Sequence, residues 1–117
     1  MERRHSQRVP VSLEAQIIAE RKVYSGVIDN ISEDGMEYLV TSFIKADKDF
    51  TSEKRVEMNF RAPSGEAVNL HCEVKWRKES AIDDRVLIVG MKIINPSPDY
   101  RKLIKDIYIN NSDDEHI

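Results

Sequence analysis

Strict alternation of apolar and polar side chains over residues 68–77 constrains the fold of this chain more than any other sequence feature. Every second residue of this stretch is apolar: Val68, Leu70, Cys72, Val74 and Trp76. Successive side chains of a β-strand point to opposite faces, so this period predicts a strand with one face in a core and the other in water. Such a strand is typical of antiparallel sheets, because their second face is commonly solvated.

Five further segments have the composition of strands and are separated by turn signals. They cover residues 13–19, 22–31, 35–40, 56–61 and 85–94. A Pro-Ser-Gly sequence at 63–65 lies between two of the strands at the spacing of a hairpin. Gly90 lies inside the last strand, where we expect a bend or the close approach of another backbone. Residues 42–52 are mainly polar and are predicted to form a loop.

The C-terminal segment changes to helical spacing. Its apolar residues recur at intervals that place them on one helix face: Tyr100, Leu103, Ile104, Ile107 and Tyr108. Ser97 suits the N-cap and Pro98 suits the first helical position, which predicts a helix over 97–111 and an acidic tail over 112–117. The predicted fold class is therefore all-β with one C-terminal helix, a six-stranded antiparallel β-barrel over residues 13–96.

Length and charge narrow the classes of function. The chain has 117 residues, one domain of ordinary size, and 40% of them are apolar, which is enough for one core. The net charge of -3 argues against a protein that coats DNA, since the whole surface of such a protein is basic. No stretch approaches the roughly 20 apolar residues that span a bilayer, and no apolar run follows the basic N-terminus as in a secretory signal. We therefore expect a soluble, cytoplasmic protein with no membrane partner.

Catalysis is not expected from this sequence. Its three histidines, His5, His71 and His116, include no pair with metal-ligand spacing. Cys72 is the single cysteine, so an internal disulfide framework and a cysteine-cluster zinc site are excluded, and its inward parity indicates a buried core residue. The chain also has no GxSxG, P-loop or GxGxxG motif. We predict no enzyme activity, no catalytic residue, no metal site and no cofactor.

Three arginines gather near the N-terminus, on a segment that we expect to be a flexible arm over residues 1–12. Arg3, Arg4 and Arg8 lie within six positions of one another. A planar guanidinium binds phosphate and guanine edges through paired hydrogen bonds and stacks on aromatic bases, which suits arginine better than lysine. On charge alone, a solvated basic tail is the alternative.

A second polar feature is the segment from Asn30 to Gly35, with the sequence Asn-Ile-Ser-Glu-Asp-Gly. Asn30 and Ser32 are two positions apart, so on an extended chain they point to the same face and present hydrogen-bonding groups to one ligand. Gly35 has a freedom of φ that other residues lack, which suits a turn. Taken alone, the segment also fits an ordinary polar turn between two strands.

The order and spacing of these two features resemble the PilZ domain, a bacterial receptor module for cyclic di-GMP. Arg4 and Arg8 form an RxxxR motif, and Asn30 to Gly35 form a [D/N]xSxxG motif, with one strand hairpin between them. The resemblance covers nearly the whole chain, including the strand that ends near Trp76 and the last strand before the helix. It implies the family fold, a six-stranded antiparallel split barrel.

The resemblance also implies a ligand site. The implied contacts of cyclic di-GMP are Arg3, Arg4, Arg8, Asn30, Ser32 and Gly35. The resemblance implies that the three arginines bind phosphates and the acceptor edges of guanine. Asn30 and Ser32 would bind the other guanine, and Gly35 would shape the turn. Asn30 stands where many members have Asp, and its single carbonyl predicts weaker affinity for the guanine N–H edge. Trp76 continues the alternation of Cys72 and Val74, which favours a place in the core. The alternative is that Trp76 lies at the barrel rim and lines the guanine site.

The implied function is a cyclic di-GMP receptor or adaptor that changes conformation and signals to an unidentified protein effector, in motility, biofilm formation or a related output. Three arginines match the two phosphate charges of this ligand, and we expect the arm to fold over it on the barrel. Two alternatives stay open: a PilZ-type protein–protein interaction module without nucleotide binding, and a barrel for single-stranded nucleic acid. No DNA or RNA partner is expected, because the net charge is negative and aromatic residues are few.

Overall fold

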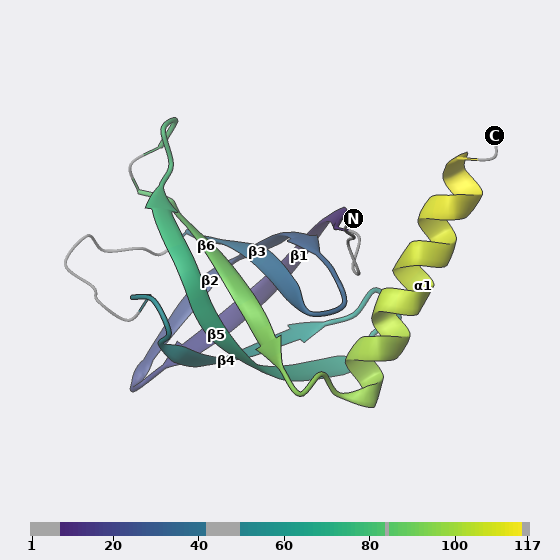
Figure 1. Cartoon of the computed structure of the whole chain (residues 1–117), viewed down its shortest axis with the longest axis horizontal. Coiled ribbons are helices and arrows are strands. Elements are labelled where there is room, and N and C mark those ends of the chain that lie inside the picture. Colours follow the sequence, from purple (N-terminus) through teal and green to yellow (C-terminus); the bar gives the residue numbers. More distant parts are fainter. Residues whose placement is uncertain (1–7, 42–49, 84, 116–117) are drawn as a thin grey trace, which may run out of the picture.

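The computed structural model of the chain describes residues 8–41, 50–83 and 85–115. Within these residues, six strands precede one helix: β1 (Val9–Ala19), β2 (Lys22–Ile31), β3 (Gly35–Val40), β4 (Arg55–Arg61), β5 (Ala67–Glu79), β6 (Leu87–Ile94) and α1 (Pro98–Glu115). The strands close into a barrel in the order β1-β2-β3-β6-β5-β4, and every neighbouring pair is antiparallel. Figure 1 shows this barrel with the helix beside one of its ends. The predicted fold class is confirmed.

The core of the barrel consists of the inward apolar residues of its strands. In β5, four of the residues that alternation predicted to face inward are at most 3% exposed: Val68, Leu70, Cys72 and Val74. Phe50, which precedes β4, is fully buried and packs edge to face on Tyr24, with ring centroids 4.9 Å apart. Burial of one such side chain contributes about 1.5–3 kcal/mol, so the interior is the main source of the barrel's stability.

β1 begins at Val9, four residues before the predicted start of the first strand. Val9 is 4% exposed and lies opposite Ile31 of β2. Pro10 obscures this start in the sequence, because it has no amide hydrogen to donate to a sheet. The register of β1 against β2 shifts just after Pro10, and proline is tolerated at such a bulge. Residues 9–12 therefore belong to the barrel rather than to the predicted arm, and residues 1–7 lie outside the described part of the chain.

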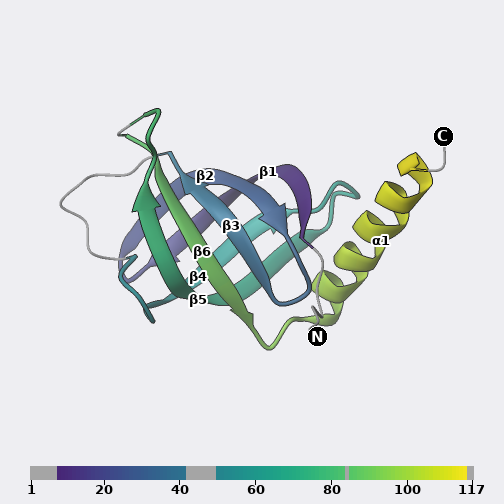
Figure 2. The ribbon, with the colours of Figure 1, turned by 45° about the horizontal axis from the view of Figure 1, so that its top comes forward.

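α1 begins as predicted but continues further. The Oγ of Ser97 accepts a hydrogen bond from the backbone N–H of Tyr100 at 3.2 Å, which is the geometry of an N-cap. The helix reaches Glu115, so most of the predicted acidic tail is helical, since no glycine or proline interrupts it after its first residue. Figure 2 shows the first turns of α1 near the barrel and the rest extending beyond it. Among the residues described, no helix is long and apolar enough to cross a membrane.

The assignment of Trp76 to the core is wrong, because 44% of this residue is exposed. β5 contains a β-bulge, since Val74 lies opposite Met91 but Trp76 lies opposite Gly90. The extra residue inverts the alternation beyond Val74, so the side chain of Trp76 lies on the outer face of the barrel. Its indole covers Gly90 so closely that a Cβ built on this glycine would overlap the ring. The close approach expected at Gly90 is thus made by a side chain rather than by a backbone.

Candidate ligand-binding site

The two sequence motifs meet at the open end of the β1–β2 hairpin. Arg8 directly precedes β1, and Asn30 lies near the end of β2, where Pro10 is its partner in the sheet. Nη1 of Arg8 donates to Oδ1 of Asn30 at 2.7 Å, although the two residues are 22 positions apart. Pairing of the two strands therefore joins side chains from both motifs. Arg3 and Arg4 lie outside the described residues, so their contacts stay predictions.

The side-chain amide of Asn30 is held at both ends. Its Oδ1 accepts from Arg8, and its Nδ2 donates to Oε1 of Glu37 on β3 at 3.2 Å. A shift of register between Ile28 and Asn30 places this residue, half-buried, at a bulge in the pairing of β2 with β3. The amide oxygen thus faces a guanidinium and the amide nitrogen faces a carboxylate. These two partners determine the orientation of the amide in the site.

Ser32 stabilises the turn between β2 and β3 and is only 2% exposed. Its backbone N–H donates to the carbonyl of Gly35 at 2.9 Å, and its hydroxyl lies 3.2 Å from the same carbonyl and 3.3 Å from Oδ1 of Asp34. Because β2 ends at Ile31, strand alternation alone does not place Ser32 on the face of Asn30. The Oγ of Ser32 nevertheless lies 3.9 Å from the Cβ position built on Gly35, and Nη2 of Arg8 lies 3.6 Å from the same position. Direct contact of Ser32 with a ligand stays a prediction.

Gly35 is needed here for a close approach rather than for its backbone angles. Its φ is not in the positive region, so the conformational freedom expected at this position is not used. A Cβ built on Gly35 would lie 2.9 Å from the carbonyl oxygen of Met91 on β6 and 3.6 Å from Nη2 of Arg8. The missing side chain therefore allows β3 and β6 to pack closely and leaves space beside the arginine.

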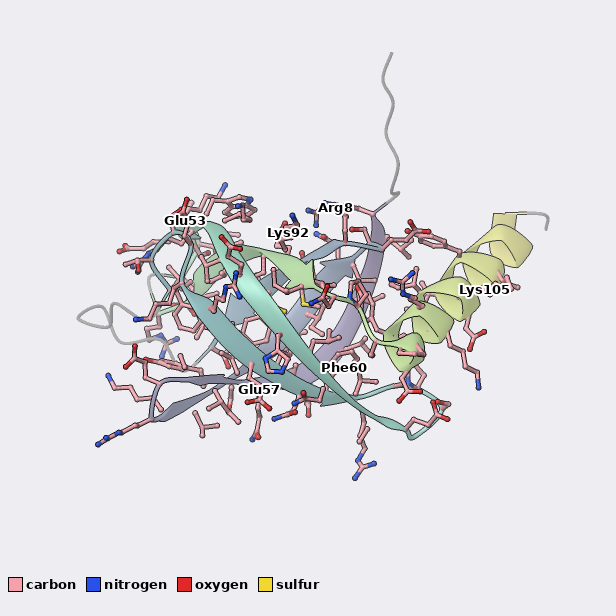
Figure 3. The ribbon with its side chains drawn as sticks, turned by 60° about the horizontal axis from the view of Figure 1, so that its bottom comes forward. Arg8, Glu53, Glu57, Phe60, Lys92 and Lys105 are labelled. Carbon is pink, nitrogen blue, oxygen red and sulfur yellow. The ribbon has the colours of Figure 1, made fainter. Side chains whose placement is uncertain are left out.

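A second cation lies beside Arg8. Lys92 is opposite Gly35 in the pairing of β3 with β6, and its side chain is exposed. Figure 3 shows Arg8 and Lys92 near each other on one side of the barrel. Gly35 has no side chain, so it leaves space for a phosphate group beside these two cations, although Lys92 also lies opposite Glu73 of β5. The sequence did not single out Lys92, although its polar place between Met91 and Ile93 marks an outward side chain.

A row of outer residues connects this surface with Trp76. Asn30 lies opposite Glu37, Glu37 opposite Gly90, and Gly90 opposite Trp76. With about 4.8 Å between neighbouring strands, the row spans about 14 Å. The indole lies over Gly90, so it reaches from β5 across β6 in the direction of Glu37. An aromatic ring, an amide and two cations therefore share one outer face, which agrees with the alternative that Trp76 lines the ligand site.

The turn of the second motif is also joined to α1. The hydroxyl of Tyr100 donates to the backbone carbonyl of Ser32 at 2.5 Å, across 68 positions of sequence. Tyr100 is fully buried, and burial raises the pKa of its hydroxyl well above the ordinary value, so the group stays protonated as a donor. Leu103 and Ile104, on the same helix face, pack on the core. The candidate site and the helix therefore share a buried hydrogen bond.

The single cysteine of the chain lies in the core. Cys72 is buried, as predicted, and burial raises the pKa of its thiol to about 12. Such a thiol is neutral at physiological pH and is a poor nucleophile. Within residues 8–41, 50–83 and 85–115, no three His, Cys, Asp or Glu side chains form a group that could hold a metal ion.

Comparison with known proteins identifies the family. Among solved structures, the chain is similar to the Bacillus subtilis inhibitor of motility (MotI/DgrA), with a TM-score of 0.79 and 15% identity, which shows a shared fold alone. The match covers 97% of this chain and 53% of the other, so this chain spans about half the length of its neighbour. A search of curated proteins gave no match. The PilZ domain model matches residues 2–110, which include both motifs and all six strands, and the chain therefore belongs to the PilZ domain family.

Proposed function

We propose that this protein is a receptor for cyclic di-GMP and that the ligand binds on the outer face around Arg8, Asn30 and Gly35. The hydrogen bond between Arg8 and Asn30 carries the proposal, since it joins the two PilZ motifs across 22 positions of sequence. Membership of a family of cyclic di-GMP receptor modules supports the choice of ligand. The exposed side chains of Arg8 and Lys92 give the face the positive charge that a dianionic ligand requires.

Each group of the outer face matches one part of this ligand. Arg8 and Lys92 are assigned to phosphate oxygens, which charge-assisted hydrogen bonds hold most strongly. Oδ1 of Asn30, once released by Arg8, is assigned to the N–H groups of a guanine edge. The indole of Trp76 is a stacking surface for a base, and a contact of this kind contributes about 1–3 kcal/mol.

Ligand binding is proposed to order the N-terminal arm and to change the surface offered to a protein effector. Arg3 and Arg4 belong to this arm, and the family motif implies that they close over the ligand. On the other side of the site, the turn at Ser32 is joined to α1 through Tyr100, so a ligand that shifts the turn also acts on the helix. The name of the Bacillus subtilis neighbour makes motility the first process to examine for this chain.

Calorimetric titration with cyclic di-GMP tests the receptor function, with GTP and cyclic GMP as ligand controls. Fluorescence of Trp76 provides a second signal, since the chain has a single tryptophan. We expect saturable binding, a change in tryptophan emission, and loss of both in Arg8→Ala. Arg21→Ala is the matched control, because it removes the same charge from the turn between β1 and β2, at the opposite end of β1, and binding should persist.

Absence of saturation in a folded sample would refute the receptor function. The barrel is then better explained as a PilZ-type protein–protein interaction module. Equally tight binding of a single-stranded oligonucleotide, with the same loss in Arg8→Ala, would instead favour the nucleic-acid-binding alternative.

A further inference from the structure

Glu37 is a charged residue of the site that belongs to neither motif. It lies on β3 opposite Asn30, and its Oε1 accepts a hydrogen bond from Nδ2 of Asn30 at 3.2 Å. Asn30 in turn offers Oδ1 to Arg8 at 2.7 Å. Asn30 and Glu37 are both half-buried, so water competes only partly for this contact. A carboxylate, an amide and a guanidinium therefore follow one another across β3, β2 and the residue before β1.

We propose that Glu37 is a positioning residue that orients the amide of Asn30 and makes asparagine, rather than aspartate, the suitable residue at this position. The inference rests on the proposed function, because the oriented Oδ1 is the group assigned to a guanine edge. A side-chain amide has two orientations of similar shape that exchange its oxygen and its nitrogen. Since a carboxylate accepts but does not donate, Glu37 selects the orientation with Nδ2 toward itself and Oδ1 toward Arg8.

An aspartate at position 30 would remove the donor that Glu37 requires. In Asn30→Asp, the new carboxylate keeps Arg8 as a partner on one side but meets the carboxylate of Glu37 at contact distance on the other, and like charges repel in a half-buried setting. Combining Asn30→Asp with Glu37→Gln restores one donor and one negative charge to the pair, with the amide now on β3. The effects of the two substitutions are therefore expected to depend on each other.

Cyclic di-GMP titration of the single and double variants is the first test. The guanine edge alone would make aspartate the better ligand at position 30, but with Glu37 beside it Asn30→Asp is expected to weaken binding about tenfold. Adding Glu37→Gln is expected to recover most of this loss. Glu37→Ala is expected to weaken binding about three- to tenfold, because only Arg8 then orients the amide of Asn30, and Arg8 is the partner that the ligand must displace. Glu66→Gln is the matched control, since it removes an exposed carboxylate from the hairpin loop between β4 and β5. In a chain that binds the ligand, a coupling below about twofold overturns the inference.

Two ligand-free measurements distinguish failure of this inference from failure of the receptor function. By NMR, the side-chain amide resonances of Asn30 should shift in Glu37→Ala and stay unchanged in Glu66→Gln. In urea, the unfolding constant of Asn30→Asp should exceed that of the double variant about fivefold. If these results hold but cyclic di-GMP does not bind, the receptor function fails and the positioning by Glu37 stands. If the resonances do not move, or the two unfolding constants agree within about twofold, the positioning fails even where the ligand binds.

Discussion

Tyr100→Phe removes one oxygen atom and tests whether α1 holds the turn of the second motif. The lost hydroxyl donates to the carbonyl of Ser32 at 2.5 Å, and the two residues are 0% and 2% exposed. Water cannot readily replace the donor, so the substitution leaves a buried carbonyl without this partner. Such a loss costs about 1–3 kcal/mol of the free energy of unfolding. Domains of ordinary size have about 5–15 kcal/mol in total, so the change is large enough to measure.

Urea unfolding followed by circular dichroism measures this loss. With a denaturant slope of about 2 kcal/mol/M, a loss of about 2 kcal/mol lowers the midpoint by about 1 M. Tyr38→Phe is the matched control, because its hydroxyl donates to the carbonyl of Ala15 at 2.8 Å inside the barrel. Only Tyr100→Phe should speed amide hydrogen exchange in α1 and in the turn over 32–35. A loss below about 0.5 kcal/mol, or the same exchange pattern in both variants, would refute the coupling of turn and helix.

Gly90→Ala places a methyl group where the indole of Trp76 lies, so the ring must move away; tryptophan emission and cyclic di-GMP affinity should both change, and unaltered emission would contradict this packing. Gly35→Ala puts a Cβ 2.9 Å from the carbonyl oxygen of Met91 and should lower the free energy of unfolding in urea by about 1–3 kcal/mol. An unchanged midpoint would show that β3 can move away from β6 without loss of stability. Burial raises the pKa of the Cys72 thiol from its ordinary 9.0 to about 12. Above pH 9 the unfolded chain therefore releases a proton that the folded chain keeps, so the free energy of unfolding should fall by at most about 1.4 kcal/mol per pH unit. Cys72→Ala should remove this part of the slope, and an equal slope in both proteins would exclude the thiol as its source.

Local patterns predicted the strands and the helix well. β2 and β3 have the bounds expected from the sequence, because their apolar residues and the turn residues between them are all close along the chain. The alternation in β5 also placed Cys72 correctly in the core. The start of β1 was harder to predict from the sequence, since Pro10 is tolerated there only through a bulge in the pairing with β2.

Irregular pairing accounts for the wrong placement of Trp76 and for the position of Asn30. Trp76 follows a bulge in β5, and Asn30 adjoins a bulge in β2. Both bulges depend on the register between a strand and its neighbour in the sheet, so alternation along either strand alone cannot reveal them. The hydroxyl of Ser32 takes part in the hydrogen bonds of the turn, a role that depends on how the turn folds and that strand alternation does not predict.

The sequence by itself determined the class of fold and the two motifs, because apolar spacing, turn residues and the arginine and asparagine side chains are properties of short segments. Only the tertiary structure brought Glu37 and Lys92 to the site, turned Trp76 outward and joined Tyr100 to Ser32. These contacts arise where separate strands and the helix pack against one another. They depend on register and on the close approach of backbones at glycines, which no single segment encodes.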